Sequence, residues 1–127
     1  MTSKDHLRFS GEIRRVYANG KRFNGKFMTV FALATELPIH RFGITASRKA
    51  VGNSVQRNRA KRLVREAFRL NAGPLQELQQ RYDYVFNARR SLLSEKAGAA
   101  VDDLRDIISR MSRAEEKRTE IDRATVK

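Results

Sequence analysis

Apolar positions between residues 54 and 70 recur at the spacing of one face of an α-helix. They stand three or four residues apart, as Ala60, Leu63, Val64, Ala67 and Phe68. The remaining arc of this helix is polar and mostly cationic: Asn58, Arg59, Lys61, Arg62, Arg65 and Arg69, with Arg57 at its edge. Glu66 is the only acid in the segment, so the arc is not the alternating-charge surface of an ordinary solvated helix. We expect Asn53 or Ser54 to cap the helix after a flexible Gly52.

A shorter helical pattern lies near the N-terminus. Residues 10–19 carry apolar side chains on one face, namely Ile13, Val16 and Tyr17. Ser10 is suited to the N-cap, and the pair Asn19–Gly20 tolerates the left-handed conformation that ends many helices. We expect residues 1–9 to form a loosely held arm before this helix.

Runs rich in aromatic and β-branched residues predict strands at 27–34, 41–47 and 83–88. A basic turn is expected over residues 21–26, before the first strand. The second strand is expected to pair with the first, as a hairpin or a near neighbour. Because the cationic helix separates the second strand from the third, these two are expected to be parallel in a β-α-β unit.

A last helix is predicted from apolar residues at helical spacing, which are Ala97, Val101, Leu104, Ile107, Ile108 and Met111. Ser91 or Ser94 can cap it. Residues 113–127 are almost wholly charged and polar, so we expect a solvated helical extension or a disordered tail there. Residues 1–112 are expected to form a single domain.

The charge balance indicates what the cationic helix is for. The chain of 127 residues carries 27 Lys and Arg against 14 Asp and Glu, a formal net charge of +13. Such a charge on a small domain favours nucleic acid as the partner over an acidic membrane surface or an acidic protein. No apolar run approaches the roughly 18 residues that span a bilayer, and the first residues lack the apolar core of a secretory signal. We therefore expect a cytoplasmic protein that does not bind membranes.

The sequence offers little for catalysis or metal binding. There is no cysteine, and the two histidines, His6 and His40, fall in the terminal arm and in a loop. Asp102 and Asp103 are adjacent and do not share a helix face, so we interpret them as a solvated edge of the last helix. We expect no catalytic residue, no metal site and no tightly bound cofactor. If this chain takes part in phosphodiester chemistry, the catalyst lies elsewhere.

Aromatic residues lie among the cations in the first half of the chain, a combination typical of proteins that hold single-stranded RNA. Tyr17 follows two arginines and is expected to be partly exposed. Phe27 and Phe31 would share one strand face, so both belong either to the core or to an exposed groove. Three further phenylalanines are expected in the core: Phe42, Phe68 and Phe86.

Three runs in the cationic helix follow one another closely: Arg57-Asn58-Arg59, Lys61-Arg62 and Arg65-Glu66-Ala67-Phe68. Together they resemble the RNR signature of the bacterial ribonuclease P protein subunit. The strand and cation pair just upstream, Phe42 to Lys49, are similar to those of the same family. The resemblance extends from about Leu7 to Met111. A bare Arg-Asn-Arg would mean nothing, but this order of strand, turn, cations and apolar face is specific.

The resemblance implies an α+β (α/β) two-layer sandwich with a central, mostly antiparallel four-stranded sheet and helices packed on it. Its fold would resemble the domain of a ribosomal small-subunit protein. A left-handed β-α-β crossover is also implied, although the general rule for such units is right-handed. In these terms residues 1–112 are the ribonuclease P protein domain, and 113–127 are a charged extension without a family pattern.

The resemblance implies a function as well. The chain would be the protein subunit of a ribozyme that removes the 5′ leader from precursor tRNA, and the RNA subunit would perform the hydrolysis with Mg²⁺. The expected partners are the ribonuclease P RNA and precursor tRNA. The protein itself is expected to be a monomer that binds the RNA one to one.

By the same resemblance, two sets of residues contact RNA. The first faces the RNA subunit: Asn53, Arg57, Asn58, Arg59, Lys61, Arg62, Arg65 and Arg69. The second binds the single-stranded leader in a cleft between the first helix and the sheet: Ile13, Tyr17 and Phe31, with Ser47, Arg48 and Lys49 nearby. Ile13 stands where many family members carry an aromatic residue, so we expect apolar contact there in place of stacking.

Two other functions remain open from the sequence. A ribosomal-type or general RNA-chaperone domain would share the basic helix but would not prefer a 5′ leader. An independent metal-dependent nuclease is disfavoured because the acids are scattered along the chain.

Overall fold

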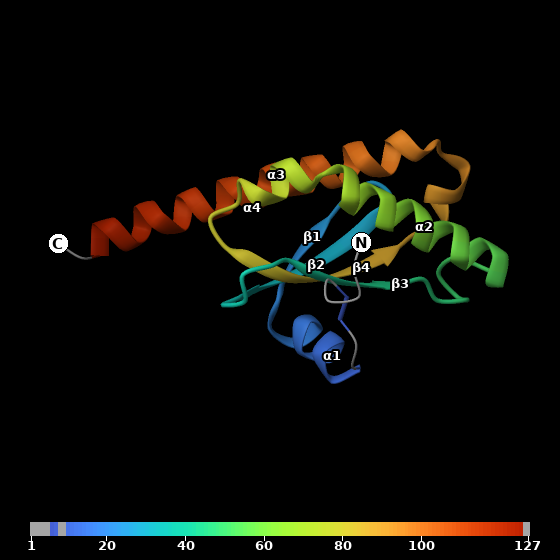
Figure 1. The fold of residues 1–127 in the computed structure, drawn as a ribbon, viewed down its shortest axis with the longest axis horizontal. Coiled ribbons are helices and arrows are strands. Elements are labelled where there is room, and N and C mark those ends of the chain that lie inside the picture. Colours follow the sequence, from blue (N-terminus) through green and yellow to red (C-terminus); the bar gives the residue numbers. More distant parts are fainter. Residues whose placement is uncertain (1–5, 8–9, 126–127) are drawn as a thin grey trace.

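The computed structural model describes residues 6–7 and 10–125. Its elements are α1 (Ser10–Asn19), β1 (Lys21–Asn24), β2 (Met28–Thr35), β3 (Arg41–Thr45), α2 (Ser54–Leu70), α3 (Ala72–Gln76), β4 (Arg81–Ala88), the 3₁₀ helix η2 (Arg90–Ser94) and α4 (Ala97–Thr125). Figure 1 shows a central sheet with α2 and α4 on one side and α1 on the other. None of the helices in this described part combines the length and the apolar character needed to cross a membrane.

The four strands form one sheet in the order β1-β2-β4-β3. The pairs β1–β2 and β2–β4 are antiparallel, and β3 pairs with β4 in parallel. The predicted α+β sandwich with a mostly antiparallel sheet is therefore confirmed, as is the parallel unit in which α2 connects β3 to β4. The expected pairing of the second strand with the first is wrong, because β4 lies between β2 and β3. Four consecutive buried residues in β4 suit this central strand, whose two faces are covered by α2 and α4 on one side and by α1 on the other.

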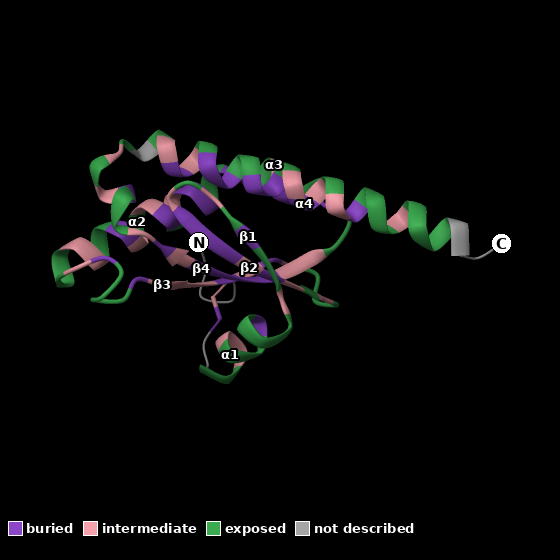
Figure 2. Cartoon of the chain, turned by 180° about the vertical axis from the view of Figure 1, so that it is seen from behind, coloured by how far each residue is buried: buried purple, intermediate pink, exposed green. Residues whose placement is uncertain are grey.

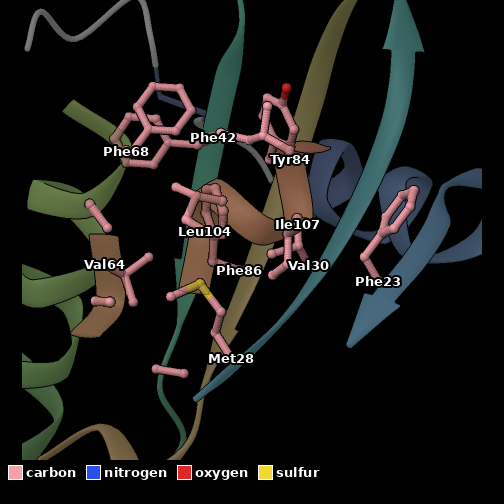
Figure 3. Packing of buried hydrophobic residues seen from close by; sticks show 14 of the residues in the cluster. Phe23, Met28, Val30, Phe42, Val64, Phe68, Tyr84, Phe86, Leu104 and Ile107 are labelled. Carbon is pink, nitrogen blue, oxygen red and sulfur yellow. The ribbon is translucent and has the colours of Figure 1, made fainter. Parts of the chain in front are cut away.

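Side chains of β4 alternate between two hydrophobic clusters. Tyr84 and Phe86 belong to the larger cluster, under α2 and α4, whereas Val85 belongs to a smaller one under α1. Figure 3 shows the larger cluster, in which the rings of Phe42 and Phe68 lie 4.5 Å apart between centroids. The prediction that Phe42, Phe68 and Phe86 are core residues is confirmed. In Figure 2 the buried positions follow the sheet and the inner sides of both long helices.

Phe27 and Phe31 pack on different clusters, so the prediction that they share one face is wrong. Phe31 packs against the smaller cluster and Phe27 against the larger one. The physical reason is that β2 begins only at Met28, and Phe27 belongs to the turn before it. The N–H of Gly25 closes this turn by donating to the Met28 carbonyl at 2.8 Å, so strand alternation does not reach back to Phe27.

Strand β1 takes the place of the basic turn predicted over residues 21–26. Phe23 is its single buried side chain, and one apolar residue among polar ones produces no detectable period. These residues form a strand because they pair with β2. Helix α1 passes directly into β1 without a left-handed residue, since Gly52 alone has a positive φ within the described residues. Gly20 is needed there for a close approach, because a Cβ would lie 2.5 Å from the Val16 carbonyl oxygen.

The N-terminal arm is held to the sheet where the structure describes it. His6 forms a parallel bridge with Phe42, and the N–H of Leu7 donates to the Phe42 carbonyl at 2.9 Å. Leu7 is buried in the smaller cluster, so the prediction of a loose arm is wrong for these two residues. Residues 1–5 and 8–9 of the predicted arm lie outside the described residues.

Helix α4 begins later than predicted, and its C-terminal part is the helical extension that was one of the two expectations for residues 113–127. Ser91 and Ser94 lie in η2 and do not cap it, since the helix begins at Ala97. It continues unbroken to Thr125, past the sheet in Figure 1, and residues 126–127 lie outside the described part. Its side chain Asp103 is buried and accepts the N–H groups of Lys26 at 2.8 Å and Phe27 at 2.9 Å. The predicted solvated edge is therefore wrong for Asp103, whereas Asp102 is exposed.

Candidate nucleic-acid interface

The N-terminus of α2 is built as a capping box. The Asn53 side chain accepts the N–H of Gln56 at 2.9 Å, and the Gln56 side chain accepts the N–H of Asn53 at the same distance. Gly52 precedes the cap with φ of 138°, and a Cβ at this position would lie 2.0 Å from Oε1 of Gln56. The predicted cap and its glycine are confirmed, and Asn53 therefore uses its side-chain oxygen within the protein.

Helix α2 buries the face that its period predicts. Ala60, Val64, Ala67 and Phe68 are buried against the sheet and α4. Burial of a side chain such as Val64 or Phe68 stabilises the fold by roughly 1.5–3 kcal/mol. This packing leaves the opposite arc of the helix directed to solvent.

The solvent arc carries the predicted cations in differing surroundings. Asn58, Arg59, Arg62 and Arg65 are exposed, while Arg57 and Lys61 are half-buried. Arg69 is paired with Glu66 one turn earlier. No acid within ion-pair distance of Arg59, Arg62 or Arg65 occurs among the residues that the structure describes. These three guanidinium groups therefore lie on one helix surface with their charge uncompensated.

A short turn between β3 and α2 presents Ser47, Arg48 and Lys49. All three are exposed, and the turn is closed by the Ser47 hydroxyl, which accepts the N–H of Ala50 at 3.0 Å. Buried Val51 anchors its far side, and the N–H of Val51 donates to the Ser47 carbonyl at 2.9 Å. Arg48 and Lys49 are thus held just before the α2 arc. The Ser47 hydroxyl oxygen already accepts one hydrogen bond within the protein.

The predicted leader residues Ile13, Tyr17 and Phe31 come together on the α1 side of the sheet. Tyr17 meets Phe31 edge to face with 4.8 Å between ring centroids, and both Ile13 and Phe31 pack against the smaller cluster. The guanidinium of Arg22 lies over the Phe31 ring at 5.8 Å. Sequence reasoning missed Arg22, because its place over Phe31 depends on the unpredicted strand β1.

The hydroxyl of Tyr17 is fixed by two residues that the sequence analysis did not select. It donates to the side-chain oxygen of Asn87 at 2.6 Å and lies 3.3 Å from the hydroxyl of Thr45. Thr45 itself donates to Asn87 at 2.6 Å. The register of the parallel pair places Thr45 directly beside Asn87. Polar residues at alternating positions of the two predicted strands were the signal that could have found them.

On the same side of the sheet, at the end of β3 away from Thr45, an ion-pair cluster holds α1 in place. Arg41 donates to Glu12 of α1 at 2.9 Å and to both oxygens of Asp83 at 2.9 and 2.8 Å. Hydrogen bonding to Asp83 raises the pKa of the Arg41 guanidinium above its usual value. The bidentate geometry links β3 and β4, and Glu12 adds the helix to them.

Within the described residues, no three His, Asp or Glu side chains stand close enough together to hold a metal ion. His40 is buried, with Nε2 donating to the Leu75 carbonyl at 3.0 Å and Nδ1 accepting the N–H of Tyr82 at 3.2 Å. Burial lowers the pKa of this imidazole. His40 thus connects α3 to the start of β4.

Fold and surface together define a small basic α+β domain whose charges suit a polyanion. The Ribonuclease P family model matches residues 1–112. The ribonuclease P protein component of Clostridium botulinum (strain Loch Maree / Type A3) is 39% identical over 88 residues, which cover 69% of this chain and 77% of that protein. That of Caldanaerobacter subterraneus subsp. tengcongensis is 34% identical over 111 residues, covering 87% and 92%.

Solved structures agree with this fold. The RNase P protein of Thermotoga maritima superposes with a TM-score of 0.71 at 26% identity, covering 83% of this chain and 96% of that one. A mutant RNase P protein of Staphylococcus aureus reaches a TM-score of 0.72 at 21% identity, which shows the fold alone. The chain belongs to the ribonuclease P protein family. The expected role as a protein subunit of ribonuclease P, involved in 5′ processing of tRNA, is confirmed.

Proposed function

We propose that this protein binds the ribonuclease P RNA through the solvent arc of α2 and holds the single-stranded 5′ leader of precursor tRNA on the α1 side of its sheet. Phosphodiester cleavage then belongs to the RNA subunit and its Mg²⁺, with no tightly bound cofactor on the protein. The protein acts in the cytoplasm as a monomer, one copy per RNA. The observation that carries this proposal is the uncompensated charge of Arg59, Arg62 and Arg65 on one helix surface.

Like charges on one helix repel each other, and a polyanion relieves that repulsion. Arginine suits the task because its planar guanidinium makes forked contacts with phosphate. Together with the half-buried Arg57 and Lys61, the three uncompensated arginines make five cations on the helix. If each meets one phosphate, log affinity should fall with log salt concentration with a slope of roughly −3.5 to −4.5. Asn58 on the same helix and Asn53 at its cap would add uncharged contacts, whereas Arg69 is already paired.

The α1 side offers a different surface, which suits bases more than phosphates. Tyr17 is 37% exposed, and with Phe31 it provides rings on which a base can stack, at about 1–3 kcal/mol per base. Ile13 supplies apolar contact beside them. Arg48 and Lys49, only a few residues beyond Thr45 in the chain, would hold the leader's backbone.

Three of the chain's acids are engaged in holding its fold. Asp83 binds Arg41, Asp103 binds the turn before β2, and Glu115 binds the loop before β4. Metal-assisted cleavage needs carboxylates that converge on the metal ion, and these three serve other partners. This supports placing the catalytic groups in the RNA subunit. A general RNA chaperone, the main rival, would use the α2 arc equally but would not need the aromatic pair under α1.

The test is cleavage of precursor tRNA by a bacterial ribonuclease P RNA at low Mg²⁺ concentration. Added protein should restore cleavage at the mature 5′ end, and the protein alone should leave the substrate intact. Arg62→Ala should weaken binding to the RNA subunit about tenfold, whereas Arg123→Ala, an exposed arginine near the end of α4, should have no effect. Tight RNA binding without restored cleavage would contradict the proposal and favour a chaperone.

A further inference from the structure

Three side chains of β4 lie on the α1 side of the sheet and divide it into zones. Asp83 is in the ion-pair cluster with Arg41, Val85 is in the smaller hydrophobic cluster, and Asn87 is in the polar group with Tyr17 and Thr45. The first two zones are closed by contacts within the protein. Asn87 differs, since among the described residues only the oxygen of its amide has hydrogen-bond partners.

The orientation of the Asn87 amide follows from its hydrogen-bond lengths. The hydroxyls of Tyr17 and Thr45 each lie 2.6 Å from Oδ1. This is a normal length for O–H···O but shorter than the usual N–H···O range, so the oxygen faces both hydroxyls. Each hydroxyl spends its hydrogen on Oδ1, and the planar amide is held by two bonds from two different elements.

The amide nitrogen of Asn87 therefore points away from these hydroxyls. It has no hydrogen-bond acceptor among the described residues, 6–7 and 10–125. Two buried side-chain nitrogens of this part lack a hydrogen bond, Arg57 Nε and Arg110 Nε, although the second lies 3.2 Å from the Asp106 carboxylate, and Asn87 Nδ2 is not one of them. Since Asn87 is half-buried, its nitrogen keeps access to solvent and offers two N–H donors in a fixed direction.

We propose that Asn87 is a specificity-determining residue that donates to the edge of one leader base. This inference rests on the proposed binding of the leader beside Tyr17 and Phe31. An amide whose oxygen is engaged can only donate, so it suits a base edge with carbonyl acceptors. Uracil with O4 and guanine with O6 present such an edge, whereas cytosine and adenine place an amino donor there. One leader position should therefore prefer uracil or guanine roughly three- to tenfold, the effect of one hydrogen bond.

The test uses the holoenzyme, assembled from the protein and a ribonuclease P RNA, and a set of precursor tRNAs with each of the four bases at successive leader positions. Dissociation constants are measured for intact substrate and for mature tRNA. Asn87→Asp keeps the oxygen for Tyr17 and Thr45 but replaces the donor with an acceptor. The preferred bases at that one position should then change to adenine and cytosine. Asn87→Ala should abolish the preference.

The preference ratio separates this role from a structural one, because misfolding or added charge lowers affinity for all four bases alike. Asn19→Asp is the matched control for charge: Asn19 is exposed at the end of α1, and its amide bonds only to the Arg15 carbonyl. It should leave the ratio unchanged. If the leader raises affinity but Asn87→Asp leaves the base preference as in the wild type, the inference is overturned and the proposed function stands. If removing the leader does not change the dissociation constant of the wild-type holoenzyme, both this inference and the proposed function are wrong.

Discussion

Replacing Glu115 with alanine should destabilise the whole domain, although this residue lies beyond the part that the family model matches. Its carboxylate is buried and accepts three hydrogen bonds, from the N–H of Gln79 at 2.9 Å, the N–H of Gln80 at 3.1 Å and the hydroxyl of Tyr82 at 2.5 Å. Burial and this carboxylate raise the pKa of Tyr82. The second part of α4 is thereby tied to the loop that leads into the central strand β4.

The magnitude follows from these contacts. A hydrogen bond to a charged group contributes about 1.5–3 kcal/mol, but Gln79 and Gln80 are exposed and water can replace the carboxylate at their N–H groups. Removal of the side chain should therefore lower the free energy of unfolding by about 2–4 kcal/mol. For a chain of this length the melting temperature should fall by roughly 6–16 °C. Tyr82→Phe removes only one of the three bonds and should cost about 1–1.5 kcal/mol.

Urea unfolding followed by circular dichroism measures the change, with Glu116→Ala as the control. Glu116 is the exposed neighbour on the same helix, and its loss should change the free energy of unfolding by less than about 0.5 kcal/mol. An unchanged unfolding midpoint for Glu115→Ala would refute the reasoning, since it would mean that the extension of α4 does not hold the loop in solution. Equal losses for Glu115→Ala and Glu116→Ala would point to the removal of a negative charge from this strongly cationic protein, and not to the loss of the buried hydrogen bonds.

Three further predictions test other parts of the structure. Burial lowers the pKa of His40, so the unfolded chain binds more protons than the folded one below about pH 6.5. The His40 contribution to stability should therefore be complete above that pH and be lost as the pH falls. In thermal melts recorded from pH 7.5 to 5, the melting temperature of His40→Gln should depend less on pH than that of the wild type. Gly25→Ala should destabilise the fold by about 1–3 kcal/mol in urea titrations, because a Cβ would lie 2.6 Å from the Asp103 carboxylate; no loss would contradict that contact. The salt slope of binding to the RNA subunit should become shallower by about one unit in Arg59→Ala, and an unchanged slope would exclude a phosphate contact.

Helix α2 could be predicted almost completely from the sequence. Its apolar residues repeat at helical spacing from Ala60 to Phe68, and the capping box uses Asn53 and Gln56, which are three residues apart. Such contacts are local, so spacing along the chain is enough to find them. Tyr17 and Phe31 were also selected as a site, on the resemblance, and the structure brings them into contact.

The partners that complete each site were not predictable in this way. Tyr17 and Asn87 are separated by 70 positions, and Phe27 and Asp103 by 76. No sequence pattern in one segment predicts its contact with the other. Strand β1 was missed for a related reason, since Phe23 is its one buried residue and the strand exists only through its pairing with β2.

The sequence by itself determined the net charge of this protein, the cationic arc of α2, the parallel unit around it and the family to which the chain belongs. These depend on neighbours within a few turns of helix or on whole-chain composition. Only the tertiary structure decided that β4 lies between β2 and β3, and that Asp103 and Glu115 bind backbone N–H groups of distant loops. It also decided that the amide oxygen of Asn87 binds Tyr17 and Thr45, while its nitrogen has no acceptor in the part of the chain that the structure describes. Polar groups removed from water must find partners, and which partner is within reach depends on how the strands are ordered.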